Sequence, residues 1–239
     1  MATQRVQLLD LGRTDYRTAW SLQQRLHAEV ASEQRPDIWI FVEHDPVVTL
    51  GRNAQLAHLR LSEAELKERG VDCVRVERGG DATYHGPGQL VVYPIRRLAR
   101  FREVVPLVRT IEGAIIDACA QLGVHAERWS EHAGIWVGTA QICAVGLAIQ
   151  KMTSFHGLAL NCTTVLDYDE LITPCGLSER GITSLSRELG REVSIAEARP
   201  IVQASLAETF ELEFEPITLL RLEGEAGEQA ASEPKQARL

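Results

Sequence analysis

Arg78-Gly79-Gly80-Asp81-Ala82-Thr83-Tyr84-His85-Gly86-Pro87-Gly88-Gln89 is the stretch with the strongest structural signal in this chain of 239 residues. Its four glycines and one proline let the backbone come close to a neighbouring group, because glycine lacks a Cβ and proline fixes its own φ angle. Apolar runs at residues 73–76 and 90–95 flank the stretch, and each predicts a β-strand. Between them lie a cation, hydroxyls and an imidazole, which is more chemistry than a turn requires. The sequence therefore favours a loop built for binding or catalysis, with a simple hairpin connection as the alternative.

Strand and helix patterns alternate along the rest of the chain. Asp15 is placed to cap a helix, and Ser62 with Glu65 forms a capping-box pattern before another short helix. The predicted strands are residues 5–11, 37–42, 46–50, 135–137, 142–149 and 155–161, and the longer predicted helices are 16–31, 103–122, 183–189 and 195–210. We predict an α/β (α+β) fold, a mixed sheet flanked by helices, in a single domain of residues 1–222. Residues 223–239 are polar and small, so we expect a disordered tail there.

Composition and motif searches argue against several classes of protein. The formal net charge of −8 disfavours nucleic-acid binding, and no stretch of 18 apolar residues predicts a membrane span. The start of the chain lacks an apolar signal core, and five cysteines without C-x-x-C spacing disfavour both disulfides and zinc. The glycine-rich stretch matches neither G-x-x-x-x-G-K-[ST] nor G-x-G-x-x-G, so nucleotide binding through a helix N-terminus is not expected. We therefore expect a cytoplasmic monomer that needs no metal or other cofactor.

Four ordered segments together resemble the lipoyl/octanoyl transferases of lipoate biosynthesis. Residues 78–89 are similar to R-G-G-x-x-T-Y-H-G-P-G-Q, 43–51 to E-H-x-P-V-x-T-x-G, 154–161 to S-x-H-G-x-A-L-N, and 174–185 to P-C-G…T-S-L. The resemblance implies the catalytic domain shared by lipoate and biotin protein ligases. It also implies that an octanoyl group passes from octanoyl-acyl carrier protein to the ε-amine of a lysine. That lysine lies on a lipoyl domain of a 2-oxoacid dehydrogenase or on the glycine-cleavage H protein.

The resemblance makes Cys175, in the P-C-G segment, the nucleophile that carries the acyl group as a thioester. A thiol with a pKa of about 8.5 is only a few per cent ionised at neutral pH, so a neighbouring group has to assist it. His85 and His156 are candidates for proton transfer, with a structural role as the alternative, whereas a structural role is favoured for His44. The acyl pocket implied by the resemblance is lined by Arg78, Gly79, Gly80, Asp81, Ala82, Thr83, Tyr84, His85, Ala144, Val145, Gly146, Gly157, Leu158 and Ala159. The other cysteines (Cys73, Cys119, Cys143 and Cys162) are expected to be buried apolar residues.

The chain departs from the family pattern at Gln141. The family's G-x-K-I-[AC]-x-x-G has a lysine there, which is thought to lower the pKa of the cysteine. Glutamine can donate a hydrogen bond but carries no charge, and each pKa unit changes the thiolate population about tenfold. Lys151 lies roughly 33 Å further along a continuous strand, so only a chain reversal would bring it back.

Three interpretations of this departure remain open. A histidine, His85 or His156, takes the place of the lysine as the partner of Cys175. Alternatively, Gln141 leaves a catalytically impaired homologue that binds octanoyl groups or lipoyl domains, or the chain is an ATP-dependent lipoate ligase. A separate feature is the group Arg96, Arg97, Arg100 and Arg102. It is either a patch that attracts the acidic carrier protein or a solvated basic face.

Overall fold

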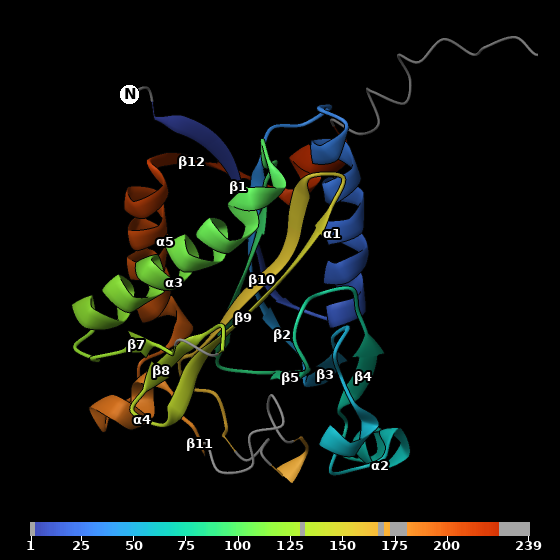
Figure 1. The fold of residues 1–239 in the computed structure, drawn as a ribbon, viewed down its shortest axis with the longest axis vertical. Helices are drawn as coiled ribbons and strands as arrows, with labels where there is room; N and C mark the ends of the chain where they lie inside the picture. Colours follow the sequence, from blue (N-terminus) through green and yellow to red (C-terminus); the bar gives the residue numbers. More distant parts are fainter. Residues whose placement is uncertain (1–2, 130–131, 167–169, 173–180, 225–239) are drawn as a thin grey trace, which may run out of the picture.

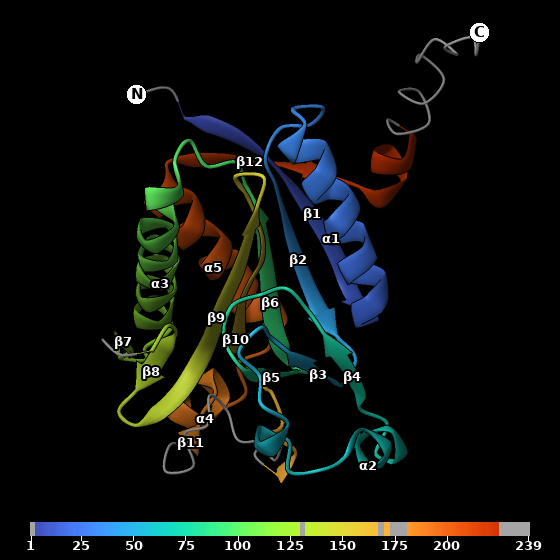
Figure 2. The same ribbon diagram turned by 45° about the vertical axis from the view of Figure 1, so that its right-hand side comes forward.

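The computed structural model describes residues 3–129, 132–166, 170–172 and 181–224, and a nine-stranded mixed sheet runs through these residues (Figures 1 and 2). In spatial order the strands are β12 (Leu212–Ile217), β1 (Gln4–Thr14), β2 (Ile38–His44), β6 (Gln89–Ile95), β10 (Thr153–Asn161), β9 (Ala140–Gln150), β8 (Ile135–Val137) and β7 (Glu127–Arg128). β1 is parallel to both of its neighbours, β12 and β2, whereas each neighbouring pair from β2 onward is antiparallel. β11 (Gly181–Ile182) is the ninth and pairs with the start of β9.

Helices cover both faces of this sheet. α1 (Tyr16–Ala31) lies on one face, and α3 (Val104–Gln121) and α5 (Ile195–Phe210) lie on the other (Figure 2). Because both faces are covered, β2 and β6 are buried along almost their whole length, as the continuous apolar run of the first of them predicted. The predicted mixed sheet flanked by helices is confirmed.

A second sheet of three strands packs beside the first one. β3 (Val47–Leu50) lies between β4 (Asp72–Arg75), which is parallel to it, and β5 (Ala82–His85), which is antiparallel. The short elements η1 (Leu56–His58) and α2 (Glu63–Glu68) connect β3 to β4, while η2 (Phe101–Glu103) precedes α3 and α4 (Leu185–Leu189) follows β11. Sequence reasoning treated residues 78–89 as one loop and did not predict β12. The structure corrects the first point, because all four residues of β5 pair with β3.

The β9–β10 hairpin settles where Lys151 lies. Lys151 and Met152 form its turn with φ angles of 47° and 57°, the left-handed conformation that tight hairpins require. Gln141 is at the opposite end of β9. Lys151 lies in the turn itself, so the chain reversal does not bring its side chain back to Gln141. A second hairpin joins β8 to β9, with Gly138 at its turn.

The local signals for helix ends are also confirmed. The Asp15 side chain accepts a hydrogen bond from the Thr18 amide, and Ser62 and Glu65 form a complete capping box. Within the described part of the chain no helix is both long enough and apolar enough to cross a membrane. Residues 223 and 224 are still helical, and the remainder of the predicted tail lies outside the described residues.

Candidate active site

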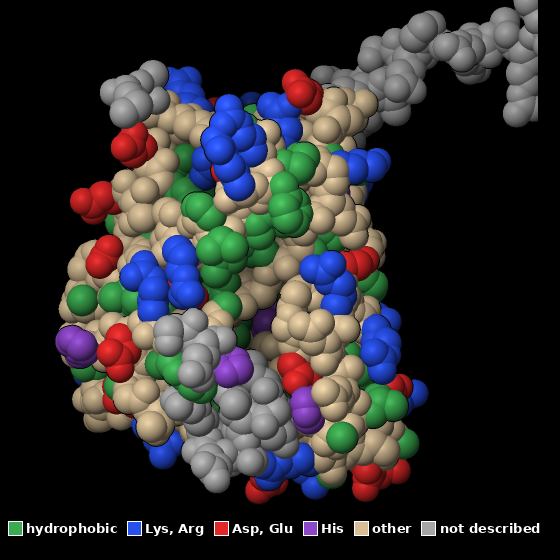
Figure 3. All heavy atoms as spheres, in the orientation of Figure 1, with side chains coloured by type: hydrophobic (Ala, Val, Ile, Leu, Met, Phe, Trp, Pro, Cys, Tyr) green, Lys and Arg blue, Asp and Glu red, His purple; other side chains and the backbone are tan. Residues whose placement is uncertain are grey.

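A cavity of about 790 Å³, its open mouth included, is lined by residues of both sheets. Figure 3 shows it as a hollow below a band of hydrophobic side chains. All fourteen residues predicted for the acyl pocket line it, together with Gln141 and His156. Cys175 lies outside the described residues, so the structure brings together every predicted site residue except the nucleophile.

The loop before β5 forms one wall because it is held against β9. The Gly79 amide donates to the Leu147 carbonyl at 2.9 Å, and the Arg52 amide donates to the Arg78 carbonyl at 3.0 Å. A Cβ at Gly146 would lie 3.2 Å from the carbonyl oxygen of Gly79, which is tight for a side chain. Glycine at this position therefore allows the loop to cross β9 closely, as the glycine-rich sequence predicted.

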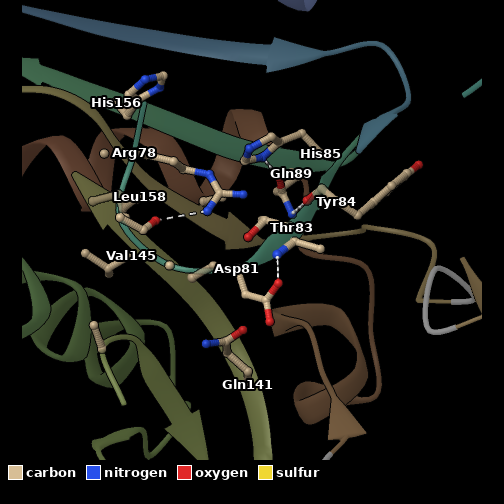
Figure 4. Close-up of a pocket in the computed structure, with 18 of the residues that line it drawn as sticks. Arg78, Asp81, Thr83, Tyr84, His85, Gln89, Gln141, Val145, His156 and Leu158 are labelled. Carbon is tan, nitrogen blue, oxygen red and sulfur yellow. Dashed lines mark hydrogen bonds between the residues drawn. The ribbon is translucent and has the colours of Figure 1, made fainter. Parts of the chain in front are cut away.

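Arg78 is a buried cation at this wall, with only 6% of the residue exposed. Its Nη2 donates to the carbonyl oxygen of Thr49 at 2.7 Å and to the hydroxyl of the same residue at 2.8 Å. These bonds fix the guanidinium against β3, and Figure 4 shows it on the same side of the cavity as His85 and His156. A fixed buried cation raises the cost of a second positive charge nearby.

His85 belongs to the interior of the cavity. Its Nδ1–H donates to Gln89 Oε1 at 2.7 Å, and Gln89 in turn donates to Asn161 Oδ1 at 2.9 Å. The imidazole stacks on Tyr16 with ring centroids 5.9 Å apart. Burial, with smaller contributions from neighbouring cationic groups, lowers the pKa of His85 to about 3. The ring is therefore neutral at pH 7 and is poorly suited to supply an imidazolium partner for a thiolate.

His156 is held in an unusual backbone conformation beside Gly157. Its φ angle is 55°, and its amide donates to Gln23 Oε1 of α1 at 3.0 Å instead of to a neighbouring strand. Such left-handed residues inside strands cost free energy and often mark functional sites. The Nε2–H faces Glu77 Oε2 at 3.4 Å, and this bond is the main cause of a pKa of about 2 for Glu77. Burial lowers the pKa of His156 itself, so a neutral imidazole donates to an ionised carboxylate.

His44 is a further buried histidine near this cavity. Its Nδ1–H donates to the Thr14 carbonyl at 2.9 Å, and its Nε2 accepts from the Tyr93 hydroxyl at 2.8 Å. Burial lowers its pKa as well. His44 is absent from the cavity wall, but Tyr93, which it positions, lies there, in agreement with the structural role that the sequence favoured.

Sequence reasoning missed six residues of the wall, namely Tyr16, Gln89, Tyr93, Ala133, Asn161 and Ile172. Gln89 and Asn161 are the last residues of two matched segments, so the motifs contained a signal for them. Tyr93 carries a hydroxyl in a strand that is otherwise apolar, which is a weaker signal. The contributions of Tyr16 and Ala133 depend on tertiary packing alone.

Gln141 lies at a different part of the cavity. It pairs with Ile182 of β11 and accepts a hydrogen bond from the Thr183 amide at 3.0 Å. Figure 4 shows it well apart from His85 and His156. No lysine is present among the described residues of the wall, so none of these residues supplies the ammonium that the family motif has at this position.

The remaining cysteines and the arginine group are partly as predicted. Cys119, Cys143 and Cys162 are fully buried, and burial raises the pKa of the first and the last to about 12. Cys73 is only half-buried, because β4 is an edge strand of the small sheet. Arg96 and Arg97 lie in ion pairs with Asp37 and Glu33, which reduces the positive charge of that group.

Comparisons with known proteins agree with this geometry. The family model described as the lipoyl protein ligase A/B catalytic domain matches residues 15–207. An octanoyltransferase from Syntrophobacter fumaroxidans is 41% identical over 217 residues, which are 90% of this chain and 95% of that protein. An octanoyltransferase from Chloroflexus aggregans is 43% identical over 206 residues, which are 84% of this chain and 93% of that protein. A bipartite lipoate protein ligase from Thermoplasma acidophilum shares the fold, with a TM-score of 0.74 at 21% identity over 96% of this chain and 93% of that one.

The fold and the cavity thus define a catalytic domain of the lipoyl protein ligase A/B class, an enzyme class. Because relatives above 40% identity across most of both chains are octanoyltransferases, the chain belongs to the octanoyltransferase family, as its four sequence segments predicted.

Proposed function

We propose that this protein moves an octanoyl group from octanoyl-acyl carrier protein to the ε-amine of a lysine on a lipoyl domain, through a thioester on Cys175. The acceptors are the lipoyl domains of 2-oxoacid dehydrogenases and the glycine-cleavage H protein, and the reaction begins lipoate biosynthesis. The observation that carries the proposal is that the predicted acyl-binding residues line one cavity in a chain whose relatives are octanoyltransferases.

Chain connectivity supports Cys175 as the nucleophile. Ile172 lies on the cavity wall, and Gly181 pairs with Ala140 next to Gln141. The two described residues that flank the P-C-G segment are therefore both at this cavity. Three residues span at most about 11 Å, so Cys175 is within that distance of Ile172.

The cavity suits an acyl chain better than a sugar or a nucleotide. The small and apolar side chains Ala144, Val145, Leu158 and Ala159 form much of the part contributed by β9 and β10. Neutral imidazoles and tyrosine rings lie in the interior, and hydrogen bonds to Thr49 hold the cation Arg78. We also propose that the enzyme works as a monomer in the cytoplasm. The four described cysteines are free, as in a reducing compartment.

The test is the intact mass of the protein after mixing with octanoyl-acyl carrier protein, beside a Cys175→Ser variant. We expect one added octanoyl group that hydroxylamine removes and that the variant does not acquire. The loaded protein should then acylate a lipoyl domain without ATP. An adduct on the variant would overturn the role of Cys175, and a requirement for ATP would favour a lipoate ligase.

Gln141 supports a second candidate, a homologue that binds octanoyl groups or lipoyl domains without turnover. A neutral side chain at this place leaves Cys175 without the family's positive charge. The same experiment separates the two functions, because the second candidate predicts binding with neither an adduct nor transfer at any pH.

A further inference from the structure

A histidine outside the sequence predictions, His58, contacts the wall of the cavity. Its Nδ1 hydrogen bonds to Asp81 Oδ2, and Asp81 is a residue of the wall. The His58 side chain is 23% exposed and the Asp81 side chain 12% exposed. Asp81 also accepts from the Ala82 amide at 2.7 Å, so its carboxylate is fixed on the loop before β5 (Figure 4). A carboxylate that orients an imidazole through Nδ1 leaves Nε2 to accept a proton.

The segment that carries His58 reaches the cavity a second time. Leu59, the next residue, forms a β-bridge with Ile172, and the Arg60 amide donates to the Leu171 carbonyl at 3.0 Å. Ile172 lines the cavity. His58 is therefore anchored between two parts of the wall, the loop of Asp81 and the strand end at Ile172.

Transfer to a lysine needs a proton acceptor at the place where the lysine arrives. An unperturbed lysine has a pKa of about 10.4, so at neutral pH its amine is almost entirely protonated and cannot attack a thioester. The interior histidines are buried against Arg78 and resist a positive charge. Gln141 cannot accept a proton at all. Asp81, at the wall, and His58, which contacts it from outside the wall, form a described pair in which a partly exposed imidazole faces a carboxylate.

We propose that His58, oriented by Asp81, is the general base for attack by the acceptor lysine. This inference rests on the proposed octanoyl transfer. His58 Nε2 takes one proton from the ammonium of the arriving lysine and releases it to solvent, which leaves a neutral amine. The amine nitrogen then bonds to the thioester carbonyl carbon, and the carbon–sulfur bond breaks with the bonding pair going to sulfur. The second proton of the nitrogen passes to the departing sulfur. No oxidant, metal or further reactant is required.

The test compares the two halves of the reaction in a His58→Asn variant. Asparagine keeps a donor close to the place of Nδ1, so the bond to Asp81 and the loop are retained while the titrating nitrogen is lost. We expect octanoyl loading within twofold of the wild type. We expect single-turnover transfer from the loaded protein to a lipoyl domain to fall about 100-fold at pH 7. Cleavage of the same thioester by hydroxylamine should stay at the wild-type rate, because its nitrogen is already unprotonated.

Two further variants sharpen the result. Asp81→Asn retains an acceptor for the imidazole but not the charge, so the ratio of the transfer rate to the loading rate should fall about tenfold. His125→Asn alters an exposed histidine beyond the end of α3 and should have no effect. Transfer within threefold of the wild type in His58→Asn overturns the inference, and so does an equal loss in hydroxylamine cleavage, which would indicate a displaced loop. A wild-type protein that never loads an octanoyl group overturns the proposed function itself.

Discussion

The histidines in the interior of the cavity and the histidine beside its wall differ in burial and in the charge of their neighbours. In the interior, His85 and His156 are buried, hydrogen-bonded and close to the fixed guanidinium of Arg78, and burial lowers the pKa of both. Beside the cavity wall, His58 is partly exposed and contacts the Asp81 carboxylate. The same type of side chain is thus enclosed and hydrogen-bonded in one region and partly open to solvent beside a carboxylate in the other. The sequence motifs highlight the interior pair and contain no signal for His58.

The largest expected effect is a loss of stability when the packing of the interior is disturbed. A Cβ at Gly157, beside His156, would lie 2.0 Å from the Val92 carbonyl oxygen, and backbone cannot move cheaply to relieve it. We expect Gly157→Ala to lower the free energy of unfolding by about 3 kcal/mol in urea titration. Gly79→Ala at the wall loop is the matched control, because its Cβ would meet the Leu147 carbonyl oxygen at an ordinary 3.5 Å. Equal losses in the two variants would show that the interior strands are no more tightly packed than the loop.

Acid provides the second test of the interior. Because the pKa of His85 is lowered to about 3 in the folded protein, the unfolded chain takes up the proton first as the pH falls below 6.5. Stability is thus fully present above that pH and is lost on acidification, by about 2 kcal/mol at pH 5 for His85 alone. The lowered pKa values of His44 and His156 act in the same direction.

Urea titration at pH 7.5 and pH 5 measures this loss of stability. A His85→Gln variant should show a smaller difference between the two pH values than the wild type, while His125→Asn, at an exposed position, should match the wild type. Unfolding free energies that agree at both pH values in the wild type would mean that the interior imidazoles bind protons as readily in the folded protein as in the unfolded chain.

The same contrast explains what the sequence could predict. The wall residues from Arg78 to His85 and from Gly157 to Ala159 were predictable because their segments resemble the motifs of a known family. Their glycine content alone indicated only a backbone that comes close to its neighbours. The strands and most helices followed from apolar periodicity and caps. The charge states did not follow, because the low pKa of His85 arises from burial against residues distant in the sequence. The His58–Asp81 contact joins η1 to a loop 23 positions away, and neither neighbourhood has a periodic pattern that predicts it.

The smallest expected effect is on the rate of octanoyl loading when the charge at position 141 is changed. Gln141→Lys restores the family's ammonium, and a lysine near Cys175 should lower the pKa of the thiol by about one unit. The thiolate population at pH 7 then rises about tenfold, but a less basic thiolate is also a weaker nucleophile. The net gain in octanoyl loading should be only about threefold.

Above the thiol pKa the order reverses, because both proteins are ionised and the wild-type thiolate is the more reactive. Loading rates followed by intact mass from pH 6 to 10 should therefore cross. A Lys151→Gln control, at the far end of β9, should follow the wild type throughout. Parallel curves that never cross would show that position 141 does not act through the charge of Cys175, and the difference between the interior and the region beside the wall would then rest on His58 and Asp81 alone.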